Sequence, residues 1–170
     1  IGRTGSLFAF EQAGIRPDIV TLAKGLGAGV PLAAVLAQNH CCCFETGDHG
    51  STWGGNPLMC AVGNAVLDIV SEPAFLASVR QAGQQLACAL QRLSAHFALG
   101  DVRGRGLLWA LEIPAGNAPA IVESARTHGL LINAPRATCL RFMPALNVTA
   151  DEIACMAERL ALAMAEVYET

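Results

Sequence analysis

Apolar residues follow different spacings in the two halves of the chain. After Pro73, three stretches repeat apolar positions every three or four residues, which predicts helices over about 74–97, 118–128 and from Thr149 to the end. Short apolar runs between them predict strands at 107–113, 130–132 and 139–142. We expect the second half to be a compact α+β unit in the order helix–strand–helix–strand–strand–helix.

The first half combines short apolar runs with glycine-rich turns. The runs at 18–22 and 32–37 flank a Gly/Pro turn, which predicts two buried strands. Asn56 is a good helix cap and Pro57 suits the first helical position, so a helix is predicted from there to about Ile69. A break at Pro73 divides the chain into an α/β domain over 1–73 and an α+β domain over 74–170.

The last predicted helix carries a start signal of its own. Thr149 and Glu152 have the spacing of a capping box, in which the hydroxyl caps the helix and the carboxylate reaches back. Val148 is placed to contact Ile153 across this first turn. The helix is therefore expected to begin at Thr149.

Lys24 is the only lysine in 170 residues, since the other ten basic residues are arginines. It lies between the apolar run 19–22 and a turn that contains three glycines. A primary amine can condense with an aldehyde and then move a proton, and arginine can do neither readily. The alternative is that Lys24 ends a strand and extends its amine into water. Both interpretations stay open on this stretch alone.

A second glycine-rich stretch, residues 47–57, leads directly into the helix predicted from Pro57. Ser51 and Thr52 place two hydroxyls just ahead of the helix N-terminus, where backbone N–H groups favour an anion. The stretch therefore predicts a phosphate site. An ordinary capped loop is the alternative.

Composition limits the classes of function. Apolar residues make up 53% of the chain and charged residues 15%, so we expect it also to bury area against a partner subunit or against a missing part of itself. The net charge of −3 offers no basic field for nucleic acid. No apolar run approaches the length of about 18 residues that a membrane span requires, and no signal peptide is recognisable.

Seven cysteines are an odd number, and three of them are consecutive at 41–43. Neighbouring cysteines do not readily bridge each other, so reduced thiols in a cytoplasmic protein are expected. His40 precedes this run, but three consecutive side chains cannot all converge on one tetrahedral ion. No metal site is predicted.

Five motifs occur in order along the chain: GRTG at 2–5, PDIVTLAKGLGAGVP at 17–31, HGSTWGGNP at 49–57, VRGRGL at 102–107 and RFMP at 141–144. Together they resemble the class III pyridoxal-phosphate-dependent aminotransferases, and most closely the acetylornithine and ornithine aminotransferase branch. The resemblance implies the C-terminal portion of a fold type I enzyme, with part of the α/β large domain followed by the small α+β domain.

The resemblance also implies roles for four residues. Lys24 would carry the aldimine with pyridoxal phosphate and then move the proton between substrate and cofactor carbons. Thr52 matches the position that binds the cofactor phosphate of the other subunit in a homodimer, with Ser51 as a neighbouring candidate. Arg141 matches the arginine that binds the substrate carboxylate. Its alternative is a strand arginine paired with a structural carboxylate.

The implied reaction moves the terminal amino group of N-acetylornithine, or of a related ω-amino acid, to 2-oxoglutarate. Ornithine and 4-aminobutyrate aminotransferases and aminomutases share the fold and the lysine, so the amino donor stays open. Family members carry an aspartate for the pyridine nitrogen and a phosphate loop upstream, and neither is in this chain. We expect the C-terminal portion of a longer enzyme, inactive alone; an inactive fragment or interaction domain is the alternative. Arg103 and Arg105 are expected to be structural or surface charges.

Overall fold

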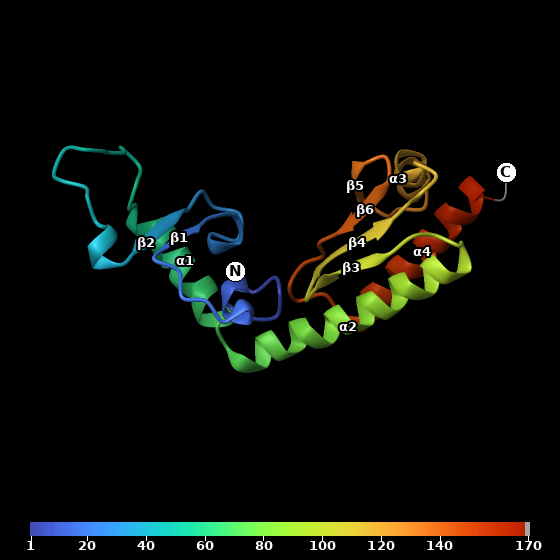
Figure 1. Cartoon of the computed structure of the whole chain (residues 1–170), viewed down its shortest axis with the longest axis horizontal. Coiled ribbons are helices and arrows are strands. Elements are labelled where there is room, and N and C mark those ends of the chain that lie inside the picture. Colours follow the sequence, from blue (N-terminus) through green and yellow to red (C-terminus); the bar gives the residue numbers. More distant parts are fainter. Residues whose placement is uncertain (169–170) are drawn as a thin grey trace. The chain divides into compact units, whose positions relative to one another are not determined.

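The computed structural model describes residues 1–168 and divides into two compact units (Figure 1). Unit 1 comprises Ile1–Gly2 and Ser6–Leu76, and unit 2 comprises Arg3–Gly5 and, of the described residues, 77–168. The division after Leu76 falls within the first turn of the helix that begins at Pro73. The assignment of 1–73 and 74–170 to two domains of an enzyme stays a prediction.

Unit 1 is built around a two-stranded ribbon and one helix. Its elements are η1 (Ala9–Ala13), β1 (Ile19–Leu22), η2 (Lys24–Leu26), β2 (Ala34–Ala37), η3 (Asn39–Cys41) and α1 (Pro57–Val70), where η denotes a short 3₁₀ helix. The two strands are antiparallel, with Ile19 opposite Ala37 and Leu22 opposite Ala34. Both strands were predicted from the sequence.

The predicted burial of these two strands is wrong for this chain. Ile19 is 54% exposed, Val35 69% and Leu36 51%. A two-stranded ribbon buries little by itself, because burial of both faces requires neighbouring strands and packed layers. The described residues of unit 1 provide one helix and short turns instead.

Helix α1 begins where the sequence predicts. The Asn56 side-chain oxygen accepts hydrogen bonds from the backbone N–H groups of Leu58 (3.0 Å) and Met59 (3.4 Å), and Pro57 occupies the first turn. The N–H of Cys60 donates to the backbone carbonyl of Asn56 at 3.0 Å. The N–H groups of the first turn are therefore satisfied by Asn56 alone.

Unit 2 contains a four-stranded antiparallel sheet and three helices, of which the first begins in the last residues of unit 1 (Figure 1). The elements are α2 (Pro73–His96), β3 (Val102–Arg105), β4 (Leu108–Glu112), α3 (Ala118–Thr127), β5 (Asn133–Arg136), β6 (Cys139–Phe142) and α4 (Ala150–Tyr168). The strands lie in the order β3–β4–β6–β5, and α3 packs against both α4 and β5.

Two elements of unit 2 differ from the sequence prediction. Strand β3 was not predicted, although its four residues pair with β4 over the full length from Val102 opposite Leu111 to Arg105 opposite Leu108. The strand expected at 130–132 is wrong, because β5 starts at Asn133 and the Leu130 N–H instead donates to the Ala125 carbonyl at the end of α3.

The core of unit 2 is formed by apolar side chains from its helices and its sheet. Its fully buried members include Leu86 and Leu90 of α2, Leu111 and Leu140 of the sheet, and Leu160 of α4. This core is what the helical spacing of the second half predicts.

Helix α4 begins with the predicted capping box. The Thr149 N–H donates to the Glu152 carboxylate at 2.8 Å, and the Glu152 N–H donates to the Thr149 hydroxyl oxygen at 3.2 Å. The Thr149 backbone N–H, followed by its hydroxyl, holds the pKa of Glu152 below its ordinary value. Two unpaired donors at the helix start are thereby satisfied.

Residues Arg3–Gly5, from the first of the motifs, pack into unit 2 rather than unit 1. The Leu107 N–H donates to the Arg3 carbonyl at 2.9 Å, and the Arg80 guanidinium donates to the Gly5 carbonyl at 2.6 Å. The Arg3 guanidinium in turn donates to the carbonyl oxygens of Leu107 and Pro144, and its partial burial lowers its pKa. This motif therefore has a structural role in this chain.

Within residues 1–168, no single helix is long and apolar enough to cross a membrane, although α1 and α2 taken together meet that test by length and composition. All seven cysteines are free thiols.

Candidate functional site

Lys24 lies directly after β1, where it is the first residue of η2. Its φ of 52° is in the left-handed region, a conformation that costs a residue with a side chain about 1–2 kcal/mol. The turn is closed by the Gly27 N–H, which donates to the Lys24 carbonyl at 3.3 Å. Such backbone outliers concentrate at functional sites, although Ala28 and Ala98 also have positive φ values.

The Lys24 side chain is exposed, and among residues 1–168 no hydrogen bond or ion pair holds its amine. An amine in this state can reach an aldehyde without first losing a partner. The exposed amine is compatible with a cofactor attached through a lysine, and equally with the alternative of a lysine that ends a strand and extends its amine into water.

Ser51 and Thr52 lie in the loop that precedes α1, and both are exposed. The Ser51 hydroxyl oxygen accepts a hydrogen bond from the Gly54 N–H at 3.0 Å, which closes a local turn. Asn56 already satisfies the first-turn N–H groups of α1, so a phosphate here must use the groups of the loop itself. Both hydroxyls stay candidates for such a contact.

Arg141 lies on β6, where it pairs with Ala110 of β4 and Asn133 of β5. Its side chain is exposed and lines a cavity of about 460 Å³ in unit 2 whose walls include Leu131, Met143 and Glu152. Arg141 forms no ion pair with another of the described residues. The alternative role, as a strand arginine paired with a structural carboxylate, therefore receives no support.

The four predicted site residues are divided between the units. Lys24, Ser51 and Thr52 belong to unit 1, and Arg141 belongs to unit 2. No hydrogen bond among residues 1–168 joins Lys24 to Ser51 or Thr52. The roles of all four residues stay predictions.

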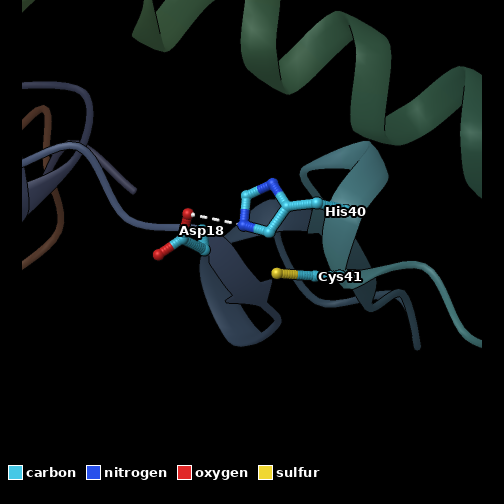
Figure 2. Close-up of side chains that lie close together, drawn as sticks. All are labelled: Asp18, His40 and Cys41. Atoms are coloured by element: carbon cyan, nitrogen blue, oxygen red, sulfur yellow. Dashed lines mark ion pairs between the residues drawn. The ribbon is translucent and has the colours of Figure 1, made fainter.

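A group that the sequence did not predict lies at the other end of the β1–β2 ribbon from Lys24. Asp18 directly precedes β1, and His40 and Cys41 are in η3, just after β2 (Figure 2). His40 Nε2 and Asp18 Oδ1 are 3.2 Å apart, and the three donor atoms lie within 4.8 Å of one another. The pairing of the two strands brings Asp18 close to the other two residues, so no local sequence spacing could have revealed the group.

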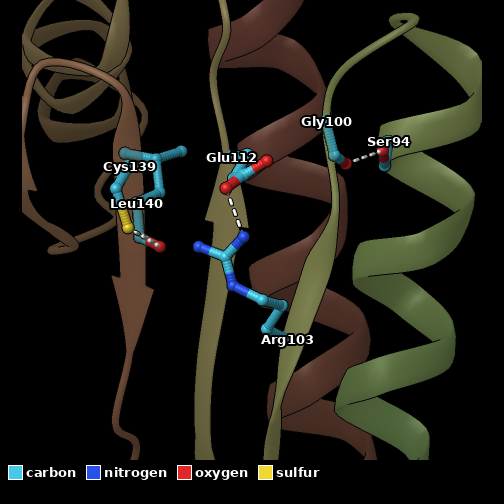
Figure 3. Close-up of polar contacts among 6 residues, drawn as sticks. All are labelled: Ser94, Gly100, Arg103, Glu112, Cys139 and Leu140. Atoms are coloured by element: carbon cyan, nitrogen blue, oxygen red, sulfur yellow. Dashed lines mark hydrogen bonds and ion pairs between the residues drawn. The ribbon is translucent and has the colours of Figure 1, made fainter.

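Arg103 has the structural role that the sequence predicts. It forms an ion pair with Glu112 across β3 and β4, next to the turn where the Ser94 hydroxyl donates to the Gly100 carbonyl at 2.7 Å (Figure 3). The hydrogen bond from Arg103 lowers the pKa of the Glu112 carboxyl. This ion pair links β3 and β4 on the exposed surface of the sheet.

Comparison with known proteins identifies one family. The model of the class-III aminotransferases matches residues 1–164. Acetylornithine aminotransferase 2 of Bordetella pertussis is 53% identical over 163 residues, which cover 94% of this chain and 41% of that protein. The acetylornithine aminotransferase of Ralstonia nicotianae is 51% identical over 158 residues, which cover 91% of this chain and 40% of that protein.

Solved structures give the same result. N-acetylornithine aminotransferase from Stenotrophomonas maltophilia matches with a TM-score of 0.84 and 37% identity over 98% of this chain and 44% of its own. Ornithine aminotransferase from Toxoplasma gondii matches with a TM-score of 0.88 and 31% identity over 99% of this chain and 41% of its own. The chain thus spans less than half the length of these relatives, and the predicted fold class is confirmed. Sequence and structure agree that the chain belongs to the class-III aminotransferase family.

Proposed function

We propose that this chain is part of an enzyme that moves the terminal amino group of N-acetylornithine, or of a related ω-amino acid, to 2-oxoglutarate with bound pyridoxal phosphate. The observation that carries the proposal is that the only lysine of a class-III aminotransferase chain stands exposed in a strained turn directly after a strand. The names of the relatives favour N-acetylornithine as the donor.

Each candidate residue has a separate task in this proposal. Bound pyridoxal phosphate supplies an electron sink for the carbon that loses its proton. Lys24 would hold the cofactor through Nζ, and its amine would take the proton from the amine-bearing carbon of the substrate. A lysine is required because a guanidinium neither condenses readily with an aldehyde nor gives up its proton.

The remaining residues bind and orient. The Thr52 hydroxyl and N–H would hold the cofactor phosphate, with the neighbouring Ser51 as a weaker candidate, whose O–H stays available as a donor although its oxygen accepts a bond from Gly54. Arg141 holds a substrate carboxylate through two parallel hydrogen bonds, a task for which a guanidinium is well shaped. Its exposed side chain and lack of an ion pair among the described residues support this role.

We propose a homodimer in which Thr52 binds the phosphate of the partner's cofactor. The exposed apolar side chains of unit 1 support such a contact, because Trp53 is 79% and Phe44 72% exposed. The seven free thiols support a cytoplasmic location. The test below has two other outcomes. In one, the amino donor proves to be ornithine or 4-aminobutyrate, and in the other, the chain proves to be a catalytically inactive interaction domain.

The proposal is tested by replacing Lys24 in the complete protein. We expect Lys24→Ala and Lys24→Arg to abolish formation of glutamate from 2-oxoglutarate, with a small added amine restoring part of the activity to Lys24→Ala alone. Arg92→Ala, on the exposed face of α2, is the matched control and should retain wild-type turnover. Turnover within tenfold of wild type in both Lys24 variants would overturn the assignment. The relative kcat/KM of N-acetylornithine, ornithine and 4-aminobutyrate then identifies the donor.

A further inference from the structure

The side chains of Asp18, His40 and Cys41 form the one group of metal-ligating residues that the structure brings together within residues 1–168. Their donor atoms are a carboxylate oxygen, an imidazole nitrogen and a sulfur, and all lie within 4.8 Å of one another (Figure 2). From these observations we propose that the three residues bind a Zn²⁺ ion, in a site that is independent of the proposed transamination.

The separations suit a single ion. Zinc binds oxygen and nitrogen at about 2.0–2.2 Å and sulfur at about 2.3 Å, so ligand atoms on a tetrahedron lie about 3.3–3.8 Å apart. His40 Nε2 and Asp18 Oδ1 are already 3.2 Å apart. The Cys41 sulfur lies within 4.8 Å of both atoms, and it must come closer to them to complete three of the four positions.

The chemistry of the three donors selects the ion. Thiolate and imidazole favour zinc over magnesium and calcium, which prefer oxygen donors throughout. When the ion binds, the S–H bond of Cys41 is replaced by a sulfur–zinc bond and the proton passes to solvent. Three protein ligands leave one position for water, so the site is open to solvent, in agreement with the exposure of Asp18 and His40.

The place of the group indicates what the ion does. Asp18 precedes β1 and the other two ligands follow β2, while the Gln38 N–H donates to the Asp18 carbonyl at 2.9 Å. A bound ion therefore ties together the end of the ribbon that lies away from Lys24. An exposed ion pair such as that of His40 and Asp18 adds little to the stability of the ribbon. A bound ion would therefore stabilise this end of the ribbon more than the ion pair does.

The neighbouring cysteines provide matched controls. Cys42 and Cys43 are exposed like Asp18 and His40, but neither belongs to the group, and the Cys42 sulfur lies 3.6 Å from the Gln38 carbonyl oxygen. Replacement of either by serine therefore tests whether zinc binds to the group or to the run of three cysteines.

The test titrates the complete protein with Zn²⁺ against a chromophoric chelator, and with Co²⁺ as a spectroscopic probe. We expect one ion per chain, a thiolate-to-cobalt charge-transfer band, and visible d–d bands of a tetrahedral complex. Asp18→Asn, His40→Gln and Cys41→Ser should each weaken Zn²⁺ binding by at least about tenfold, because the loss of even an outer-shell partner costs 10–100-fold. Cys41→Ser should also remove the charge-transfer band, and Cys42→Ser and Cys43→Ser should preserve both signals.

A second readout covers variants that fold poorly. Zn²⁺ should raise the melting temperature of the wild-type protein and protect Cys41 from alkylation, and Mg²⁺ should do neither. Absence of stoichiometric Zn²⁺ binding to the wild-type protein would overturn the proposal. The proposal would also be overturned if Cys42→Ser or Cys43→Ser lost the cobalt band as fully as Cys41→Ser does, while Asp18→Asn and His40→Gln bound Zn²⁺ like the wild type. Zinc would then be bound by the three consecutive cysteines.

Discussion

The two units differ in where their apolar side chains lie. Of the buried apolar residues among 1–168, only Leu26 and Val70 belong to unit 1, and all the others belong to unit 2. Most of the large apolar side chains that remain exposed, among them Val35, Phe44 and Trp53, belong to unit 1. Unit 2 is therefore stabilised by its own core, and unit 1 is not.

Most of the proposed site residues therefore lie in the unit that has the smaller core of its own. Unit 1 carries the proposed cofactor residues Lys24, Ser51 and Thr52, and the proposed substrate residue Arg141 lies on β6 of unit 2. Large exposed apolar patches mark surfaces that pack against something else. The unit with the proposed cofactor residues is thus the one that depends on further contacts, which agrees with a phosphate site shared between subunits.

The sharpest test of the comparison removes the same side chain from a strand of each unit. Leu140 of β6 is completely buried, and Leu36 of β2 is 51% exposed. We expect Leu140→Ala to lower the free energy of unfolding of unit 2 by about 2–5 kcal/mol, because it leaves a cavity in a packed core. Leu36→Ala should change the stability of this chain by less than about 0.5 kcal/mol.

Urea unfolding measures both effects. The chain has two tryptophans, so in a Trp53→Phe background the fluorescence of Trp109 reports on unit 2 alone. An equal loss of stability from both substitutions would show that unit 1 is as well packed as unit 2, and the comparison would fail. A complete protein in which Leu36→Ala becomes costly would instead show that β2 is covered there.

A smaller effect is expected from adding one methyl group to a helix of each unit. In α2, a Cβ at Gly83 would overlap the backbone carbonyl of Gly106, which cannot move without disturbing the β3–β4 turn. In α1, a Cβ at Gly63 would overlap the end of the flexible Leu32 side chain and would make an ordinary contact with the Leu26 carbonyl oxygen at 3.7 Å. The two sites thus test backbone packing against side-chain packing.

We expect Gly83→Ala to lower the free energy of unfolding by about 1–2 kcal/mol, since overpacking strain of up to about 3 kcal/mol exceeds the gain in helix propensity of about 1 kcal/mol. Gly63→Ala should be neutral or stabilising by up to about 1 kcal/mol, because there the gain in propensity dominates. The melting temperatures of the two variants measure the difference. If Gly83→Ala is as well tolerated as Gly63→Ala, the tight contact between α2 and the turn does not exist.

Local signals predicted the helices and the central strands of the fold. Asn56, Pro57 and the Thr149–Glu152 box act within one turn, so their effect can be read from neighbouring residues. The strand at 139–142 was predicted correctly because its apolar side chains face the core, with Leu140 and Phe142 both buried.

The elements that were missed depend on distant partners. Strand β3 contains two arginines and a glycine, and it is a strand because β4 pairs with it. Strand β5 contains Pro135, which a sheet tolerates only where no ladder hydrogen bond is needed, and β5 is an edge strand. The apolar residues 130–132 predicted a strand too early in the sequence.

Of the candidate site, the sequence supplied the residues and the resemblance supplied their roles. The uniqueness of Lys24 is visible in the sequence, but its left-handed φ and exposed amine are not. The sequence also could not show that Ser51 is engaged with Gly54, or that Arg141 has no ion pair within the described part of the chain. Both depend on side-chain geometry.

The most direct measurement is borohydride reduction of the complete protein with its cofactor bound, followed by peptide mass mapping. A lysine that holds pyridoxal phosphate as a Schiff base should be fixed as a phosphopyridoxyl amine at that position. We predict one such group per chain, on Lys24, and none in Lys24→Arg. A label on another lysine or on the terminal amine, or cofactor binding without any label, would contradict the proposal that Lys24 of unit 1 holds the cofactor.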